Sequence, residues 1–404
     1  MPIINPEILA WARQTAGLPL DDAARKIGFR DAKGRTAIDR LAALEAGAEP
    51  PSRAVLLKMA KQYRRPLLAF YLSHPPGRGD RGQDFRTLPN AIDPSADAIV
   101  DALIRDIRAR QQMVRSALED DEPATLPFIA SKGMTDGVAT VAADIKTALR
   151  FDLRIFRQQK TPDAAFSFLR DSVENLGIFV LLIGNLGSHH SAIEPEIFRG
   201  FALADPIAPF VVVNDQDAKA AWSFTLLHEV AHLWLGETGI SGGKSAQAIE
   251  RFCNEVASEL LLPTTDINAQ DWNSVANDFE ELQAKITRFA RPLNLSYSLV
   301  AYRLYRSELI DQEMWEKCRK HFRDMWRKQR ASAREQAKEN DSDGPSYYVV
   351  RRHRLGRALL SFVREQMDDG NLTPTKAAKI LGVKPRTVSP LLQGSEQEFN
   401  RANL

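Results

Sequence analysis

The stretch that decides the fold is Phe224-Thr-Leu-Leu-His228-Glu229-Val-Ala-His232-Leu-Trp-Leu235. Its mainly apolar residues, with no Pro or Gly before Gly236, predict a buried helix. His228 and His232 are four residues apart, so both imidazoles lie on one helix face and can point at one zinc ion. Glu229 lies between them, where it can take a proton from an attacking water. This HExxH motif predicts a catalytic Zn²⁺ site with Glu229 as the general base.

The zinc site also needs a third protein ligand and an open coordination position. A longer HExxHxxGxxH motif is absent, since Thr238 occupies the place of its last histidine. The third ligand is therefore expected from a later helix. There, Glu250 shares a face with Asn254, whereas Glu255 lies on a different face. Spacing alone leaves Glu250 and Glu255 as rivals.

Peptide-bond hydrolysis is the natural reaction of such a site, because zinc held by two His and one Glu polarises a carbonyl and lowers the pKa of water. The apolar run 208–214 shortly precedes the motif. As an edge strand it could align an extended peptide by main-chain pairing; as a core strand it would only support the site. Both interpretations are open at this point. We expect a zinc metallo-endopeptidase with a protein substrate.

Hydrophobic periodicity predicts an α+β fold that is mainly α. Helical spacing covers most of 5–63, then 98–120, 138–149 and 162–176, and later 219–235, 248–262 and 278–290. Short β-rich runs at 178–183, 198–203 and 210–213 predict a small mixed sheet. The expected architecture is a central domain with this sheet, between an N-terminal helical bundle and a C-terminal helical domain.

Breaker residues and charge runs divide the chain further. At roughly 100–200 residues per domain, 404 residues predict two to four domains. The predicted segments are a helical domain at 1–75, a linker and long connecting helix at 76–134, a peptidase domain at 135–310, a charged helix and linker at 311–345, and a C-terminal helical region at 346–404.

Charge and cysteine content exclude several classes of protein. Lys+Arg 54 against Asp+Glu 52 gives a net charge of +2, which excludes a polycation that binds nucleic acid by bulk charge alone. Any DNA contact must come from a local patch. Cys253 and Cys318 are far apart and have no CxxC partner, which excludes a disulfide scaffold and a thiolate zinc ribbon. They predict two buried thiols in a reducing compartment.

The chain shows no targeting or membrane signal. Its first residues lack a basic segment followed by a long apolar stretch, and no run of 18 apolar residues occurs. We expect a cytoplasmic protein without membrane association. The oligomeric state is not indicated.

Four stretches together resemble the ImmA/IrrE family of metallopeptidases. One of them, Glu250-Arg-Phe-Cys-Asn-Glu-Val-Ala-Ser-Glu-Leu-Leu-Leu-Pro263, is similar to the family's E-x-x-A-N-x-F-A-x-x-L-L-M-P. It departs from that pattern at Cys253, Val256 and Leu262, none of which is a ligand position. The other stretches are 199–214 leading into 224–233, 60–72 followed by 84–88, and the helices of the first 75 residues, which resemble a Cro/repressor-type (XRE) helix-turn-helix.

The resemblance implies a zincin-like domain of gluzincin type. The family's third zinc ligand is the Glu that opens the second motif, which here is Glu250. The implied partner is a protein substrate, a helix-turn-helix transcriptional repressor, whose cleavage relieves repression in a stress or mobile-element response. The alternative is a non-catalytic DNA-binding regulator or toxin–antitoxin component that keeps the zinc helix for structure.

Two regions raise the question of DNA binding. In a repressor-type motif the recognition helix would be about 36–44, with Arg35 and Arg40 as candidate contacts. The alternative for residues 1–75 is a retained fold that docks onto a protein. The second region is 372–389, which has the outline of helix, turn at Gly382 and helix.

Overall fold

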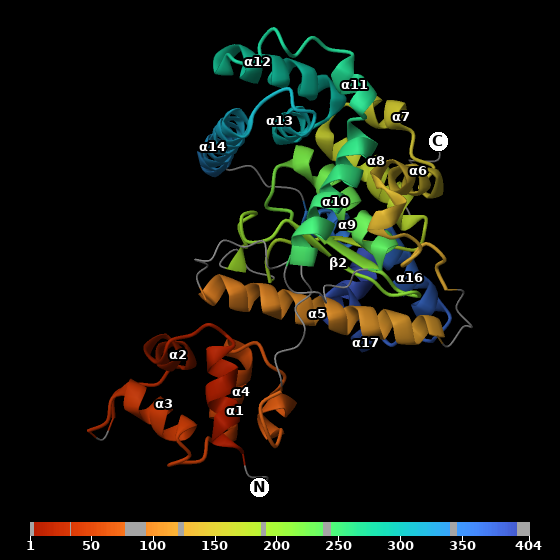
Figure 1. Cartoon of the computed structure of the whole chain (residues 1–404). Coiled ribbons are helices and arrows are strands. Elements are labelled where there is room, and N and C mark those ends of the chain that lie inside the picture. Colours follow the sequence, from red (N-terminus) through yellow and green to blue (C-terminus); the bar gives the residue numbers. More distant parts are fainter. Residues whose placement is uncertain are drawn as a thin grey trace. The chain divides into compact units, whose positions relative to one another are not determined.

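The computed structural model describes residues 4–32, 34–76, 94–119, 125–186, 191–236, 244–339 and 346–393 (Figure 1). Two compact units are present. The smaller comprises Met1–Asp106 with Asn185–Ile197, and the larger comprises Ile107–Gly184 with Phe198–Leu404. The Gly-rich and Pro-rich stretch 77–93, the linker 341–345 and the loop with His189 and His190 lie outside the described residues.

The smaller unit is built from short helices around one apolar core. Its elements are α1 (Pro6–Gln14), α2 (Leu20–Ile27), α3 (Ala37–Glu45), α4 (Arg53–Gln62), η1 (Leu67–Tyr71) and the first part of α5 (Pro94–Glu119). The side chains of Asn5, Thr36 and Ser52 cap α1, α3 and α4, as their positions before apolar helical runs predict. A bidentate ion pair, at 2.7 and 2.9 Å, joins Arg13 of α1 to Glu45 of α3. The helices predicted up to residue 63 are confirmed.

A three-stranded mixed sheet lies in the larger unit. Its strands are β1 (Phe179–Leu182), β2 (Gly200–Leu203) and β3 (Phe210–Val213), in the order β1-β3-β2. β1 runs parallel to β3, and β2 runs antiparallel to it. The interpretation of 208–214 as an edge strand is therefore wrong, because β3 is the central strand and all four of its residues are buried. A strand covered on both faces gives a continuous apolar run, wherever it stands in the sheet.

Helices surround this sheet and form most of the larger unit. They begin with the second part of α5 and continue with α9 (Lys219–Leu235), which packs on β2 and β3, and α8 (Pro162–Glu174) and α10 (Lys244–Leu261), which pack on α9. The others are η3 (Met134–Asp136), α6 (Val138–Ala148), α7 (Leu153–Gln158), α11 (Thr264–Asn268), α12 (Phe279–Ala290), η5 (Arg291–Leu293), α13 (Tyr297–Arg306), α14 (Gln312–Glu339), α15 (Tyr347–Leu355), α16 (Arg357–Asp368), α17 (Pro374–Leu381) and η6 (Pro385–Thr387). The fold is α+β and mainly α, as predicted.

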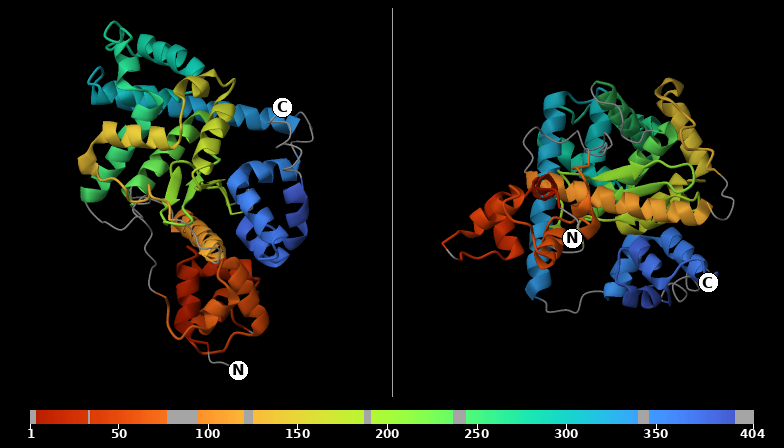
Figure 2. Two further views of the ribbon diagram at one scale, coloured as in Figure 1. Left: turned by 90° about the vertical axis from the view of Figure 1, so that its right-hand side faces the viewer. Right: turned by 90° about the horizontal axis from the view of Figure 1, so that it is seen from below.

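The C-terminal helices pack directly on the sheet. α15 and α16, in blue in Figure 2, contact β1. The Phe362 ring of α16 meets the Phe179 ring of β1 edge-on, with 5.8 Å between the ring centroids. The buried pair of Arg170 and Glu174, both on α8, fixes the corner between α15 and α16. One Glu174 oxygen accepts hydrogen bonds from the first two backbone amides of α16, at 2.9 and 3.0 Å. Arg170 donates to backbone carbonyls of α15 and β1.

Both cysteines are buried, as predicted, and they form no disulfide with each other. Burial raises the pKa of the Cys318 thiol to about 11, so this thiol stays protonated at neutral pH. Among the helices that the structure describes, none is long and apolar enough to cross a membrane.

Candidate metal centre

α9 carries the two histidines on a helix that is buried on most of its surface. It ends at Gly236, which adopts a left-handed conformation (φ 67°) and has no room for a Cβ, because Ala130 lies directly against it. The Nε2 atoms of His228 and His232 lie 3.1 Å apart. Their spacing of four residues brings both imidazoles to the same point beside the helix, as predicted.

Glu250 of α10 completes a group of three converging side chains. Its Oε2 lies 3.3 Å from Nε2 of His228, and its Oε1 lies 3.4 Å from Nε2 of His232. Ligand atoms bound to a tetrahedral zinc at about 2.0–2.1 Å stand roughly 3.3 Å from one another. The two histidine nitrogens stand at about this spacing from each other, and each stands at about this spacing from one of the two Glu250 oxygens. With one ligand atom taken from each residue, the three atoms lie within 4.8 Å of one another, and the residue types are those of a catalytic zinc site.

The electrostatics of His228 and Glu250 favour the forms that bind metals. Burial lowers the pKa of His228, and the neighbouring His232 lowers it further, so the neutral imidazole is favoured. Burial opposes ionisation of Glu250, but hydrogen bonds from both histidines outweigh it and lower the pKa of this carboxyl. Neutral imidazoles and a carboxylate are the ligand forms that zinc requires.

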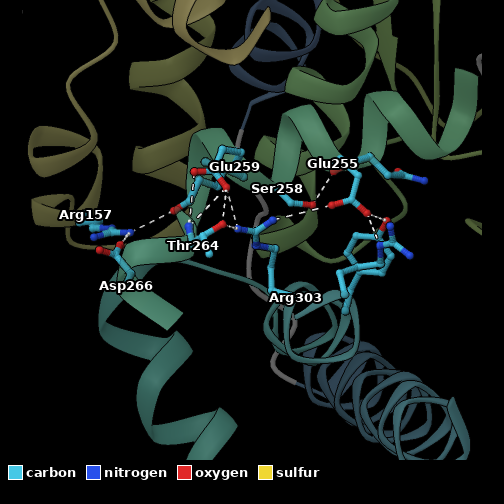
Figure 3. Close-up of polar contacts among 11 residues, drawn as sticks. Arg157, Glu255, Ser258, Glu259, Thr264, Asp266 and Arg303 are labelled. Atoms are coloured by element: carbon cyan, nitrogen blue, oxygen red, sulfur yellow. Dashed lines mark hydrogen bonds and ion pairs between the residues drawn. The ribbon is translucent and has the colours of Figure 1, made fainter. Parts of the chain in front are cut away.

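Glu255, the rival ligand, faces a different helix. Its carboxylate accepts a hydrogen bond from the Tyr302 hydroxyl at 2.9 Å and pairs with Arg306, both on α13. Arg303 lies between Glu255, at 3.8 Å, and Glu259, at 2.7 Å (Figure 3). Glu255 therefore joins α10 to α13, and among the described residues only Glu250 meets the two histidines as a third donor.

Glu229 lies next to the histidines in a protected position. Its side chain is buried, and its Oε1 approaches β2 so closely that a Cβ on Gly200 would lie 2.8 Å from it. The same Cβ would lie 2.6 Å from Thr225, one helical turn earlier. Gly200, the first residue of β2, is thus a residue of the site to which no role was assigned from the sequence. Its place inside the apolar run 198–203 is the sequence signal for a close backbone approach.

Asn254 lies one turn after Glu250 on α10, on the same helix face. Its side chain acts to raise the pKa of His228, against the larger effect of burial.

The proposed DNA contacts of the smaller unit have partners within the chain. Arg35 pairs with Glu49 at 2.5 Å, with both side chains largely exposed. Arg40 donates to the Arg30 carbonyl at 2.8 Å and lies over the Phe29 ring. These arrangements do not test DNA binding, which stays a prediction for this unit.

Comparison with known families identifies the segment that holds the site. Residues 175–305 match the family model of the IrrE N-terminal-like domain, Peptidase_M78. The match includes all four residues His228, Glu229, His232 and Glu250, and it supports a metallopeptidase domain of ImmA/IrrE type. The IrrE-like domain makes up less than half of the chain. No curated protein and no solved structure matched the chain.

Proposed function

We propose that the IrrE-like domain is a zinc-dependent endopeptidase of gluzincin type that cleaves a helix-turn-helix transcriptional repressor. The observation that carries the reaction is the convergence of His228, His232 and Glu250 on one point beside the buried Glu229. The substrate assignment rests on the resemblance to ImmA/IrrE peptidases. In this proposal, cleavage takes place in the cytoplasm and relieves repression in a stress or mobile-element response.

The three ligands and the general base have separate tasks. His228, His232 and Glu250 would hold Zn²⁺, which supplies a Lewis acid that polarises the scissile carbonyl and favours ionisation of water. The Glu229 carboxylate takes the proton of the attacking water and passes it to the leaving amine. The side chain of Glu229 is buried beside Gly200 of β2.

β2 is the strand that fits the task of aligning the substrate. β2 is an edge strand of the sheet and contacts α9. Its first residue, Gly200, lies beside Glu229. An extended peptide that pairs with an outer strand has its main chain fixed without dependence on side chains. We therefore assign to β2 the aligning role that the sequence analysis considered for 208–214.

The test co-expresses the chain with helix-turn-helix repressors encoded near its gene and compares wild type with Glu229→Gln. We expect cleavage by the wild type and a loss of about 10²- to 10⁴-fold in the variant, the usual contribution of a general base. Zinc content, measured by elemental analysis, should be equal in both. Glu280→Gln, an exposed change of the same kind on α12, is the matched control and should cleave normally.

Two results would contradict parts of this proposal. Equal cleavage by wild type and Glu229→Gln would remove Glu229 from the mechanism. A zinc-loaded wild type that leaves repressors and an unfolded protein such as casein intact would favour the non-catalytic regulator. Cleavage of casein alone would keep the peptidase and remove the repressor.

A further inference from the structure

The segment 373–393 forms a second helix-turn-helix, at the C-terminal end of the described chain. Thr373 caps α17, which ends at Gly382 in a left-handed conformation (φ 60°). The Val383 amide then donates to the Ala378 carbonyl at 2.9 Å, which closes the helix end. A new helical segment begins three residues after Gly382 and covers 385–393. This is the order of elements in a DNA-binding helix-turn-helix, with 385–393 in the place of the recognition helix.

Buried side chains hold the two helices at a fixed angle on α16. Leu381 of α17 and Val388 and Leu391 of the recognition segment are at most 1% exposed. α17 packs on α16, whose Leu359 and Val363 are completely buried. The inner face of 385–393, the recognition segment, thus packs in the core of the motif. This packing fixes the orientation of its outer face relative to α16 and α17.

Arginines of other elements fix the turn and the end of the recognition segment. Arg351 of α15 donates to the Leu381 and Gly382 carbonyls at 3.0 and 2.8 Å. The Arg110 guanidinium lies where a Cβ of Gly382 would be. Arg364 of α16 donates to the Leu392 carbonyl at 2.9 Å. These contacts use the backbone of the motif and leave its outer side chains exposed.

The outer face of the motif is positively charged. Lys376, Lys379, Lys384 and Arg386 are all exposed, and no ion pair of these four is present in the described part of the chain. Residues 370–393 contain no Asp or Glu. Because the overall charge of the chain is balanced, a DNA contact needs a local positive patch. These four side chains form such a patch.

The same face is unsuited to a protein partner. Along the recognition segment its exposed residues are Pro385, Arg386, Ser389 and Gln393. Among the described residues from 370 to 393, no large hydrophobic side chain is exposed. Centres of protein–protein interfaces are rich in aromatic residues and poor in Lys, whereas a cluster of Lys and Arg around a recognition helix is the electrostatic pattern of a DNA-binding surface.

We propose that this C-terminal motif binds double-stranded DNA, with the recognition segment in the major groove. Arg386, Ser389 and Gln393 follow one another at spacings of three and four, so they share the outer helix face and would read base edges. Lys376, Lys379 and Lys384 contact phosphates on either side. The proposal stands independently of the peptidase reaction and of the smaller unit.

The test uses the full-length chain and a pool of duplexes with a randomised core of about 20 base pairs. Repeated selection yields an enriched duplex, and fluorescence anisotropy then gives its affinity at several salt concentrations. We expect Arg386→Ala to weaken binding to the enriched duplex roughly 5- to 150-fold and to relax its sequence preference. Lys379→Ala should weaken binding to all sequences and reduce the salt slope by about 1.

Controls separate this motif from the rest of the chain. Lys146→Ala removes an exposed cation of α6 and should bind as the wild type does. Arg35→Ala combined with Arg40→Ala tests the smaller unit. If this pair abolishes binding while Arg386→Ala and Lys379→Ala leave it unchanged, the proposal is wrong. It is also wrong if a folded chain, verified by circular dichroism, enriches no duplex, an outcome that would leave the face to a protein partner.

Discussion

Glu250 and Glu255 lie five residues apart on α10 but contact different groups. Glu250 meets His228 and His232, whereas Glu255 meets Tyr302 and two arginines. Five residues along a helix turn the side chain well away from the starting face. The difference therefore comes from which neighbouring helix each face of α10 meets.

The two glutamates give opposite results when each is neutralised. Glu250→Gln should weaken zinc binding by more than the 10- to 100-fold that is typical of losing an outer partner, because it removes a ligand itself. Glu255→Gln should keep zinc affinity and lower the unfolding midpoint, because Arg306 loses its carboxylate partner and Arg303 keeps only Glu259. Competition with a zinc chelator and a thermal melt measure the two effects. Equal zinc affinity of the two variants would contradict the assignment of Glu250.

His353 gives the larger unit a specific dependence on pH. Burial lowers its pKa, and the cations Arg170, Lys219 and Arg354 lower it further, against the single anion Asp163. The unfolded chain therefore binds this proton more readily, and the free energy of unfolding falls as the pH drops below about 6.5, the ordinary histidine value. The loss ends once the pH is below the folded pKa.

His353→Gln should flatten this part of the pH profile. The measurement is urea unfolding at pH 7.5 and at pH 5.5, and the quantity of interest is the difference between the two. His74→Gln, an exposed histidine of the smaller unit, is the control and should keep the wild-type difference. An unchanged difference in His353→Gln would show that the local cations do not govern this titration.

The candidate site was predictable from sequence where the chemistry is local. The spacing of His228 and His232 determines that both share a helix face, and Glu229 is adjacent to them in the chain. Glu250 was not predictable from spacing, because α10 presents acids on two faces and only the packing of α10 against α9 and α13 distinguishes them. The family resemblance selected Glu250, the glutamate that lies beside the two histidines in the structure.

At the scale of elements, helix limits were predictable and strand order was not. Caps such as Thr36 and stops such as Gly28 act within one turn of their helix, so the sequence contains them. β3 is central because β1 and β2 pair with its two edges. β2 directly precedes β3 in the chain, but β1 is separated from β3 by β2, and no local pattern marks the pairing of β1 with β3. The run 208–214 is apolar in either position, which is why its place in the sheet could not be derived from it.

The corner between α15 and α16 depends on one glycine. Gly356 has φ 79°, and a Cβ there would collide with Glu174, Arg170 and the Val180 carbonyl. Gly356→Ala should therefore cost the roughly 1–3 kcal/mol of an unfavourable backbone conformation and, in addition, separate the buried ion pair from α16.

Gly370→Ala is the matched control for this change. Gly370 has the same φ of 79°, but nothing lies within 4 Å of its Cβ position. Both variants carry the cost of a positive φ, and Gly356 has in addition a ψ of 163°, a combination that essentially only glycine adopts. The difference between their free energies of unfolding therefore reports the collision together with this extra backbone cost. We expect Gly356→Ala to be the less stable of the two in chemical denaturation. Equal stabilities would mean that the corner adapts without loss.

At the scale of the molecule, the larger unit extends well beyond the matched family segment. Residues of α6, α7, α8 and α14, outside that segment, belong to the same hydrophobic core, and α15 and α16 contact β1. The chain thus combines a recognised domain with helices that pack on it. The sequence predicted a separate C-terminal helical region, but not that its first helix would pack on β1, because this contact joins residues at least 165 positions apart.

Removal of residues 346–404 should therefore destabilise the IrrE-like domain itself. The truncation removes the two amides of α16 that donate hydrogen bonds to Glu174. It also removes the Phe362 ring, which packs against Phe179. We expect calorimetry to give an unfolding midpoint lower by at least about 5 °C, which corresponds to roughly 2 kcal/mol for a domain of this size. Removal of only 394–404 is the control, since it keeps every contact named here. An unchanged midpoint after the longer truncation would show that the helices are accessory.

The Arg170–Glu174 pair also has a consequence for folding during synthesis on the ribosome. The pair is translated 183 residues before Arg357, whose amide it binds. At a translation rate of about 5–20 residues per second, α15 and α16 are synthesised roughly 10 to 40 s after α8 and β1, which they contact. During this interval the nascent chain exposes the charge pair and the part of β1 that α15 and α16 later bury. A stalled or shortened chain would therefore expose these groups to chaperones and proteases.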